Sequence, residues 1–123
     1  MKKKVLLVED DPFLIDIYSQ KFEKSEIELS LARSGAEAME FLKNQKPDLM
    51  LLDVVLPHLA GWEILEKIKK DPQMKDLRVI ILSNLSQQAE VEKGLSLGAE
   101  KYMIKSQFTP AEIVATVEKM LKD

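Results

Sequence analysis

The chain contains no cysteine, only four glycines and a single histidine, and each of these scarcities excludes a class of protein. Without cysteine there is no disulfide framework, no thiolate nucleophile and no cysteine-ligated metal site. The glycines do not form a glycine-rich phosphate loop, which argues against a nucleotide-binding protein. The histidine, His58, stands apart from other candidate ligands, and we expect it to be an exposed loop residue.

Long apolar runs and an excess of basic charge are also missing. The apolar run that follows the basic N-terminal residues 2–4 is four residues long, whereas a signal peptide needs roughly 7–15 apolar residues and a membrane span about 18. With 18 basic and 21 acidic residues, the net charge is −3, and no basic face for nucleic acid is expected. We therefore expect a cytoplasmic protein that binds neither membranes nor nucleic acid directly. The length of 123 residues predicts one domain over residues 1–123.

Short apolar runs alternate with amphipathic segments five times along the chain. Strands are predicted over residues 5–8, 27–32, 49–52, 79–82 and 102–104, each followed by a helix. This alternation is typical of an α/β fold, a doubly wound (βα)5 parallel sheet with helices on both faces. The runs at 5–8, 49–52 and 79–82 are continuously apolar, which places them at the centre of the sheet.

The helix boundaries carry recognisable sequence signals. Asp11, Ser34 and Thr109 have the side chains of helix N-caps and precede the first, second and fifth predicted helices. The fourth helix, around residues 87–97, has few apolar residues and an internal glycine, Gly94. Because glycine lowers helix propensity, we expect this helix to have low local stability.

Polar side chains follow the predicted strands at the points where the strands end. Ligands of open parallel sheets bind beyond the carboxyl ends of the strands. If the first and third strands are neighbours, the carboxylates there converge in one cleft. Clustered carboxylates repel one another unless a cation compensates them, and a lysine or a Mg²⁺ ion would serve. The residues concerned are Glu9, Asp10, Asp53, Ser83 and Lys105.

With these residues in these positions, the chain resembles the receiver domain of two-component response regulators. The resemblance covers nearly the whole length and rests on four segments: "VLLVEDDP" at 5–12, "PDLMLLDVVLPHLAGWEIL" at 47–65, "VIILSN" at 79–84 and "GAEKYMIK" at 98–105. It implies the flavodoxin-like strand order 2-1-3-4-5.

The resemblance also implies a phosphoryl-accepting switch that depends on Mg²⁺. Asp53 would accept a phosphoryl group from a sensor histidine kinase or a phosphotransfer protein. Asp10 and Asp53 would bind Mg²⁺ directly, Glu9 through water, and Val55 through its backbone carbonyl.

Three further residues receive roles from the same resemblance. Lys105 would pair with the phosphoryl group, Ser83 would turn its hydroxyl toward it, and Tyr102 would swing inward as an aromatic switch. The surface of the fourth helix, fifth strand and fifth helix would then change and bind an output protein or a second copy of the chain. Such a domain is not an enzyme beyond self-phosphorylation and slow self-dephosphorylation.

Two alternatives remain open. The chain departs from the family's usual Lys-Pro pair, because Ser106 follows Lys105. This departure favours an interaction module that works without phosphorylation. The second alternative is a metal-dependent phosphohydrolase, but such enzymes commonly carry a second acid two residues after the nucleophile, where this chain has Val55.

Overall fold

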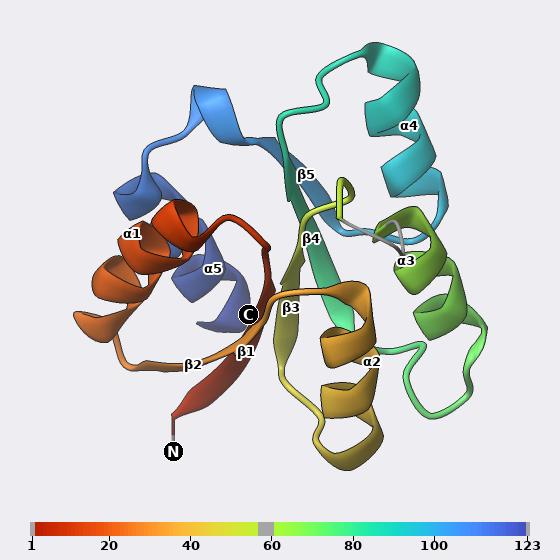
Figure 1. Cartoon of the computed structure of the whole chain (residues 1–123), viewed down its shortest axis with the longest axis horizontal. Coiled ribbons are helices and arrows are strands. Elements are labelled where there is room, and N and C mark those ends of the chain that lie inside the picture. The colour runs from red at the N-terminus through yellow and green to blue at the C-terminus, as the bar shows by residue number, and fades with distance from the viewer. Residues whose placement is uncertain (1, 57–60, 123) are drawn as a thin grey trace.

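The computed structural model describes residues 2–56 and 61–122, and it shows a five-stranded sheet between two layers of helices (Figure 1). The strands are β1 (Lys3–Val8), β2 (Ile27–Ala32), β3 (Leu49–Leu52), β4 (Arg78–Ser83) and β5 (Lys101–Ile104). The helices are α1 (Pro12–Glu23), α2 (Gly35–Asn44), α3 (Gly61–Lys70), α4 (Gln88–Ser96) and α5 (Pro110–Lys122), and the 3-10 turn η1 (Lys105–Gln107) follows β5. His58 lies outside the described residues.

All four strand pairs are parallel, and the strand order is β2-β1-β3-β4-β5. The predicted fold class is therefore confirmed. The strands with continuous apolar runs, β1, β3 and β4, occupy the three inner positions, as the sequence predicted. None of the helices in the described ranges has both the length and the apolar character that crossing a lipid bilayer requires.

The two faces of the sheet bury alternate residues of each strand, because successive side chains of a strand point in opposite directions. Val5 and Leu7 of β1 pack in a core with α1 and α5, whereas Leu6 and Val8 pack in a second core with α2 and α3. Figure 1 shows α1 and α5 on one side of the sheet and α2, α3 and α4 on the other. Both faces are covered, which explains the continuous apolar runs within the inner strands.

The predicted N-caps are present. The side chain of Asp11 accepts a hydrogen bond from the backbone N–H of Phe13 at 2.9 Å, and Ser34 and Thr109 cap α2 and α5 in the same way. These caps satisfy backbone donors that the first turn of a helix leaves without partners.

The register of the sheet aligns the carboxyl ends of the inner strands. Val8, the last residue of β1, lies opposite Leu52, the last residue of β3. The backbone N–H of Asp53 then donates to the carbonyl of Val8 at 3.1 Å. The residues that follow the two strands, Glu9 and Asp53, therefore leave the sheet side by side.

Candidate functional site

Buried polar side chains gather at this edge of the sheet. Glu9 is 1% exposed, Asp53 is 6% exposed and Ser83 is fully buried, and the described part of the chain contains no other buried acidic, basic or hydroxyl-bearing aliphatic residue. They come from the ends of β1, β3 and β4. An isolated buried carboxylate is costly, so two of them together require a compensating cation.

Lys105 supplies that cation. Its ammonium nitrogen lies 2.5 Å from Oε1 of Glu9 and 2.8 Å from Oδ2 of Asp53. The Lys105 side chain is only 10% exposed. Burial alone would lower its pKa, but the hydrogen bonds to Asp53 and Glu9 outweigh burial and raise the pKa of Lys105 above its usual value. The lysine is therefore held in its charged form between the two acids.

Glu9 is held by every oxygen it has. Its Oε2 accepts hydrogen bonds from the backbone N–H groups of Asp10 at 3.1 Å and Asp11 at 3.2 Å, while Oε1 faces Lys105. Burial raises the pKa of Glu9 in spite of Lys105 and these backbone donors. The Glu9 carboxylate is thus held in one orientation at the edge of the site.

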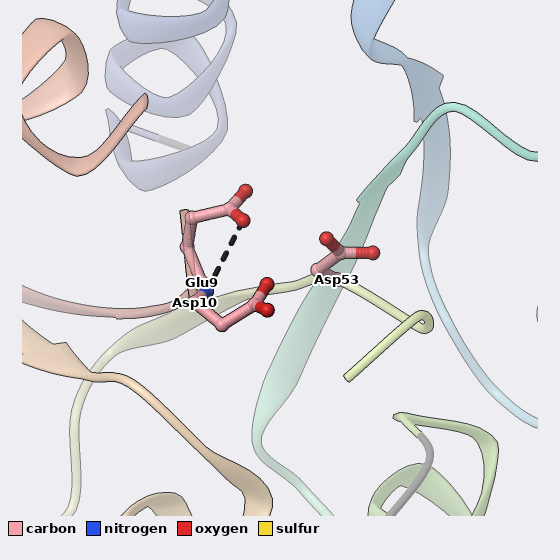
Figure 2. Close-up of side chains that lie close together, drawn as sticks. All are labelled: Glu9, Asp10 and Asp53. Carbon is pink, nitrogen blue, oxygen red and sulfur yellow. Dashed lines mark hydrogen bonds between the residues drawn. The ribbon is translucent and has the colours of Figure 1, made fainter. Parts of the chain in front are cut away.

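Asp10 has a different environment. It is exposed, and among residues 2–56 and 61–122 its carboxylate has no hydrogen-bond partner. Carboxylate oxygens of Glu9, Asp10 and Asp53 lie within 4.8 Å of one another, and Figure 2 shows the three side chains gathered at the ends of neighbouring strands. Three carboxylates so close together match the oxygen ligands that Mg²⁺ prefers. The donor set therefore fits a hard divalent cation, with Asp10 offering the most accessible oxygens.

The charged groups border an open pocket of about 410 Å³. The Asp53 carboxylate is fixed within it, because Oδ1 accepts a hydrogen bond from the backbone N–H of Val55 at 2.9 Å. Val55 itself is 57% exposed and lines the pocket. The pocket is lined by Glu9, Asp10, Asp11, Leu14, Asp53, Val55, Ser83, Asn84, Leu85 and Lys105.

Ser83 and Tyr102 are joined through the backbone of Leu85. The hydroxyl of Ser83 accepts a hydrogen bond from the backbone N–H of Leu85 at 3.2 Å, and the hydroxyl of Tyr102 donates to the Leu85 carbonyl at 2.7 Å. Burial raises the pKa of Tyr102, opposed by the nearby Ser83 hydroxyl. Both contacts use backbone atoms of Leu85, so its side-chain type gives no sign of them in the sequence.

The structure thus brings the predicted Glu9, Asp10, Asp53, Ser83 and Lys105 to one pocket. Tyr102 is not among the lining residues and reaches the site only through the loop after β4.

Comparison with known proteins identifies the family. A family model of the response regulator receiver domain matches residues 5–118. The chain belongs to this family.

Individual relatives agree with this membership. The chain is 33% identical over 122 residues to the alkaline phosphatase synthesis transcriptional regulatory protein PhoP of Bacillus subtilis, which covers 99% of this chain and 50% of PhoP. The chain therefore spans about half the length of that relative. Among solved structures, it is similar to the phosphorylated cyanobacterial phytochrome response regulator RcpA, with 31% identity, a TM-score of 0.87, and coverage of 98% and 94% of the two chains. The Mn²⁺-bound form of response regulator Rcp1 is 30% identical, with a TM-score of 0.86 and coverage of 97% and 94%.

Proposed function

We propose that this receiver domain is a signalling switch in which Asp53 accepts a phosphoryl group from a phosphohistidine of a sensor kinase or phosphotransfer protein. One observation carries the proposal: the Lys105 ammonium is held between the buried carboxylates of Glu9 and Asp53 beside an open pocket. A fixed cation at this position stabilises charge on phosphoryl oxygens as they approach Asp53. The similar response regulator RcpA has been solved in a phosphorylated form, which supports phosphorylation of this domain.

In the transfer step, a carboxylate oxygen of Asp53 attacks the phosphorus atom of the phosphohistidine. The new O–P bond forms as the P–N bond breaks, and the electron pair of that bond stays on the imidazole nitrogen, which takes a proton from solvent. The hydrogen bond from Val55 to Oδ1 keeps the carboxylate oriented toward the pocket. Lys105 remains paired with the negative charge that the phosphoryl group brings.

We further propose that the site holds Mg²⁺ through the carboxylates of Asp10 and Asp53 and the backbone carbonyl of Val55. Glu9, which is buried and accepts hydrogen bonds from the backbone and from Lys105, contributes through water. When bound, Mg²⁺ neutralises negative charge on the oxygens of the transferring phosphoryl group. The Mn²⁺-bound form of the relative Rcp1 supports a divalent cation in this family.

The phosphoryl group acts on the rest of the domain through Ser83 and Tyr102. Its oxygens accept a hydrogen bond from the Ser83 hydroxyl and draw that side chain toward Asp53. Because Leu85 contacts both Ser83 and Tyr102, the loop after β4 moves with Ser83, and the Tyr102 ring follows. The surface formed by α4, β5 and α5 changes as a result and binds an output protein or a second copy of the domain.

The proposal is tested by incubating the protein with acetyl phosphate and Mg²⁺ and measuring the intact mass. We expect a mass gain of one phosphoryl group, which chelation of Mg²⁺ abolishes and which the Asp53→Asn variant lacks. Modification that persists in Asp53→Asn would contradict the role of Asp53. No modification of the wild type would favour the phosphorylation-independent interaction module, and turnover of a general phosphate ester would favour a phosphohydrolase.

A further inference from the structure

Gly94 of α4 is buried beside Ile81 of β4 and Tyr102 of β5, and its missing side chain has a structural use. A Cβ atom at this position would lie 2.5 Å from Cδ1 of Ile81 and 3.0 Å from Cδ2 of Tyr102. It would also lie 3.3 Å from the indole of Trp62 on α3. These distances leave no room for a methyl group. Glycine therefore lets the backbone of α4 come close to the sheet.

The Tyr102 ring lies in the space that Gly94 leaves. Its Cδ2 borders Gly94 on one side, and its hydroxyl donates to the Leu85 carbonyl. The ring is half-buried and packs against the core that contains Ile81 and, at its margin, Trp62. We call the space bounded by Gly94, Ile81 and Trp62 the Tyr102 slot.

Trp62 is fixed from its outer side as well. The ammonium of Lys93, the residue before Gly94, lies 4.8 Å from the centre of the indole ring. This is a cation–π contact, which holds the first turn of α3 and the middle of α4 together. The slot is thus bounded by two helices, α3 and α4, and by strand β4.

We propose that Gly94 and Trp62 are positioning residues of the switch, which hold the Tyr102 ring in the slot and so tune the affinity of Asp53 for a phosphoryl group. The inference rests on the proposed function, since it concerns the same site. In this proposal, a ligand that draws Ser83 toward Asp53 favours the state in which the Tyr102 ring occupies the slot and its hydroxyl donates to the Leu85 carbonyl. If that state becomes less populated, the apparent affinity for the ligand falls by the same factor. A side chain added at residue 94 should therefore weaken phosphoryl binding at Asp53, although no residue of the slot lines that pocket.

The test is a double variant that removes one methyl group at residue 81 and adds one at residue 94. Ile81→Val removes the Cδ1 atom that a new Cβ at residue 94 would meet, and Gly94→Ala adds that Cβ. The double variant conserves the total side-chain volume, so the core is not overfilled. What remains are the contacts of the new methyl group with the Tyr102 ring at 3.0 Å and with the Trp62 indole at 3.3 Å.

Beryllofluoride with Mg²⁺ serves as the probe, because it mimics a phosphoryl group on a carboxylate. By isothermal titration, we expect Ile81→Val/Gly94→Ala to bind beryllofluoride about tenfold more weakly than Ile81→Val alone. We expect the affinity for Mg²⁺ alone to differ less than about twofold between them, since the carboxylates lie outside the slot. An equal loss of Mg²⁺ affinity would indicate general distortion and would overturn the inference.

Two controls separate the slot from other effects of the substitution. In a Tyr102→Ala background, adding Gly94→Ala to Ile81→Val should no longer weaken beryllofluoride binding, because the displaced ring is gone. Ala89→Gly, at an exposed position of α4, changes helix propensity without touching the slot, and its affinity should stay within about twofold of wild type. A loss that persists without Tyr102, or that Ala89→Gly reproduces, overturns the inference.

A variant on the other wall keeps the test decisive if the double variant fails to fold. Trp62→Leu removes part of the slot, and we expect a roughly threefold loss of beryllofluoride affinity that disappears in the Tyr102→Ala background. Unchanged affinity in Trp62→Leu overturns the inference while leaving phosphorylation of Asp53 intact. Failure of the wild type to bind beryllofluoride would instead overturn the proposed function, and the inference with it.

Discussion

The ammonium nitrogen of Lys105 lies 2.8 Å from Oδ2 of Asp53, although 52 positions separate the two residues in the chain. The same nitrogen reaches Glu9, so one lysine compensates two buried acids. With Asp10 beside them, three carboxylates and one ammonium leave two formal negative charges. A divalent cation supplies the matching charge, which connects the ion pairs to the proposed Mg²⁺ site.

The first prediction concerns Lys105 itself. Lys105→Met should lower the free energy of unfolding by about 3 kcal/mol in the presence of a chelator, because it leaves buried carboxylates without their cation. Saturating Mg²⁺ should recover more stability in this variant than in the wild type. Urea unfolding with and without Mg²⁺ measures both effects. Lys101→Met, at an exposed position of β5, is the control and should change stability by less than about 0.5 kcal/mol.

Asp10 should behave in the opposite way. Its carboxylate is exposed and crowded by those of Glu9 and Asp53. Asp10→Asn should therefore stabilise the metal-free protein by about 0.5–1 kcal/mol, the scale of partly exposed charge pairs. The variant should then gain much less stability from Mg²⁺ than the wild type does. Thermal melts in a Mg²⁺ series measure the difference, and coinciding Mg²⁺ responses of the two proteins would contradict a shared site.

The third prediction concerns Gly61, which lies against the backbone of Asp53 and Val54. A Cβ at Gly61 would collide with the carbonyl oxygen of Asp53 and the Cα of Val54. Gly61→Ala should destabilise the fold by about 1–3 kcal/mol and slow phosphorylation by acetyl phosphate, because the backbone at Asp53 must shift.

Gly98 provides the matched control for that substitution. It has φ of +112°, a conformation that alanine adopts only with strain, so Gly98→Ala should also cost about 1 kcal/mol. It lies beside Lys69 rather than the pocket, and the phosphorylation rate should be unaffected. Equal rates for the Gly61 and Gly98 variants would show that the close approach at Gly61 does not shape the site.

The last prediction concerns pH. Nε and Nη2 of Arg78 lie 2.7 Å and 3.1 Å from the two carboxylate oxygens of Glu100, and the hydrogen bond from Arg78 lowers the pKa of Glu100 below its ordinary value of 4.5. A lowered pKa means stability that is present above pH 4.5 and is lost as the pH falls through the lower folded value.

Glu100→Gln should therefore cost about 0.5–1 kcal/mol at neutral pH, since the pair is partly exposed, and less as the pH falls below 4.5. Unfolding midpoints measured from about pH 3 to pH 7 test this. The control is Glu66→Gln, at an exposed position of α3. Its unfolding midpoints should match those of the wild type over the same pH range.

Much of the fold was predictable because burial leaves a direct mark on the sequence. The run predicted over residues 49–52 coincides with β3, since a strand covered on both faces must be apolar throughout. The predicted strand ends differ from the observed ones: β1 begins at Lys3 rather than at residue 5, and β4 extends to Ser83 rather than ending at residue 82. These residues pair through their backbones, which hydrophobicity does not report.

The convergence of the acidic residues was also predictable, because parallel strands bring their carboxyl ends to one edge. The partners within the site were not. That Lys105 reaches Glu9 as well as Asp53 depends on side-chain conformations. Gly94 was interpreted as a source of low helix stability, which stays a prediction, whereas its packing depends on what faces it across the fold.

The bridge at Leu85 has a consequence for how such domains vary. Its N–H contacts Ser83 and its carbonyl contacts Tyr102, so the connection is made from main-chain atoms that nearly every amino acid possesses. Replacement of the leucine side chain leaves both atoms in place, and only proline removes the donor. The side chain at this position of the pocket rim can therefore vary while the backbone connection between Ser83 and Tyr102 is kept.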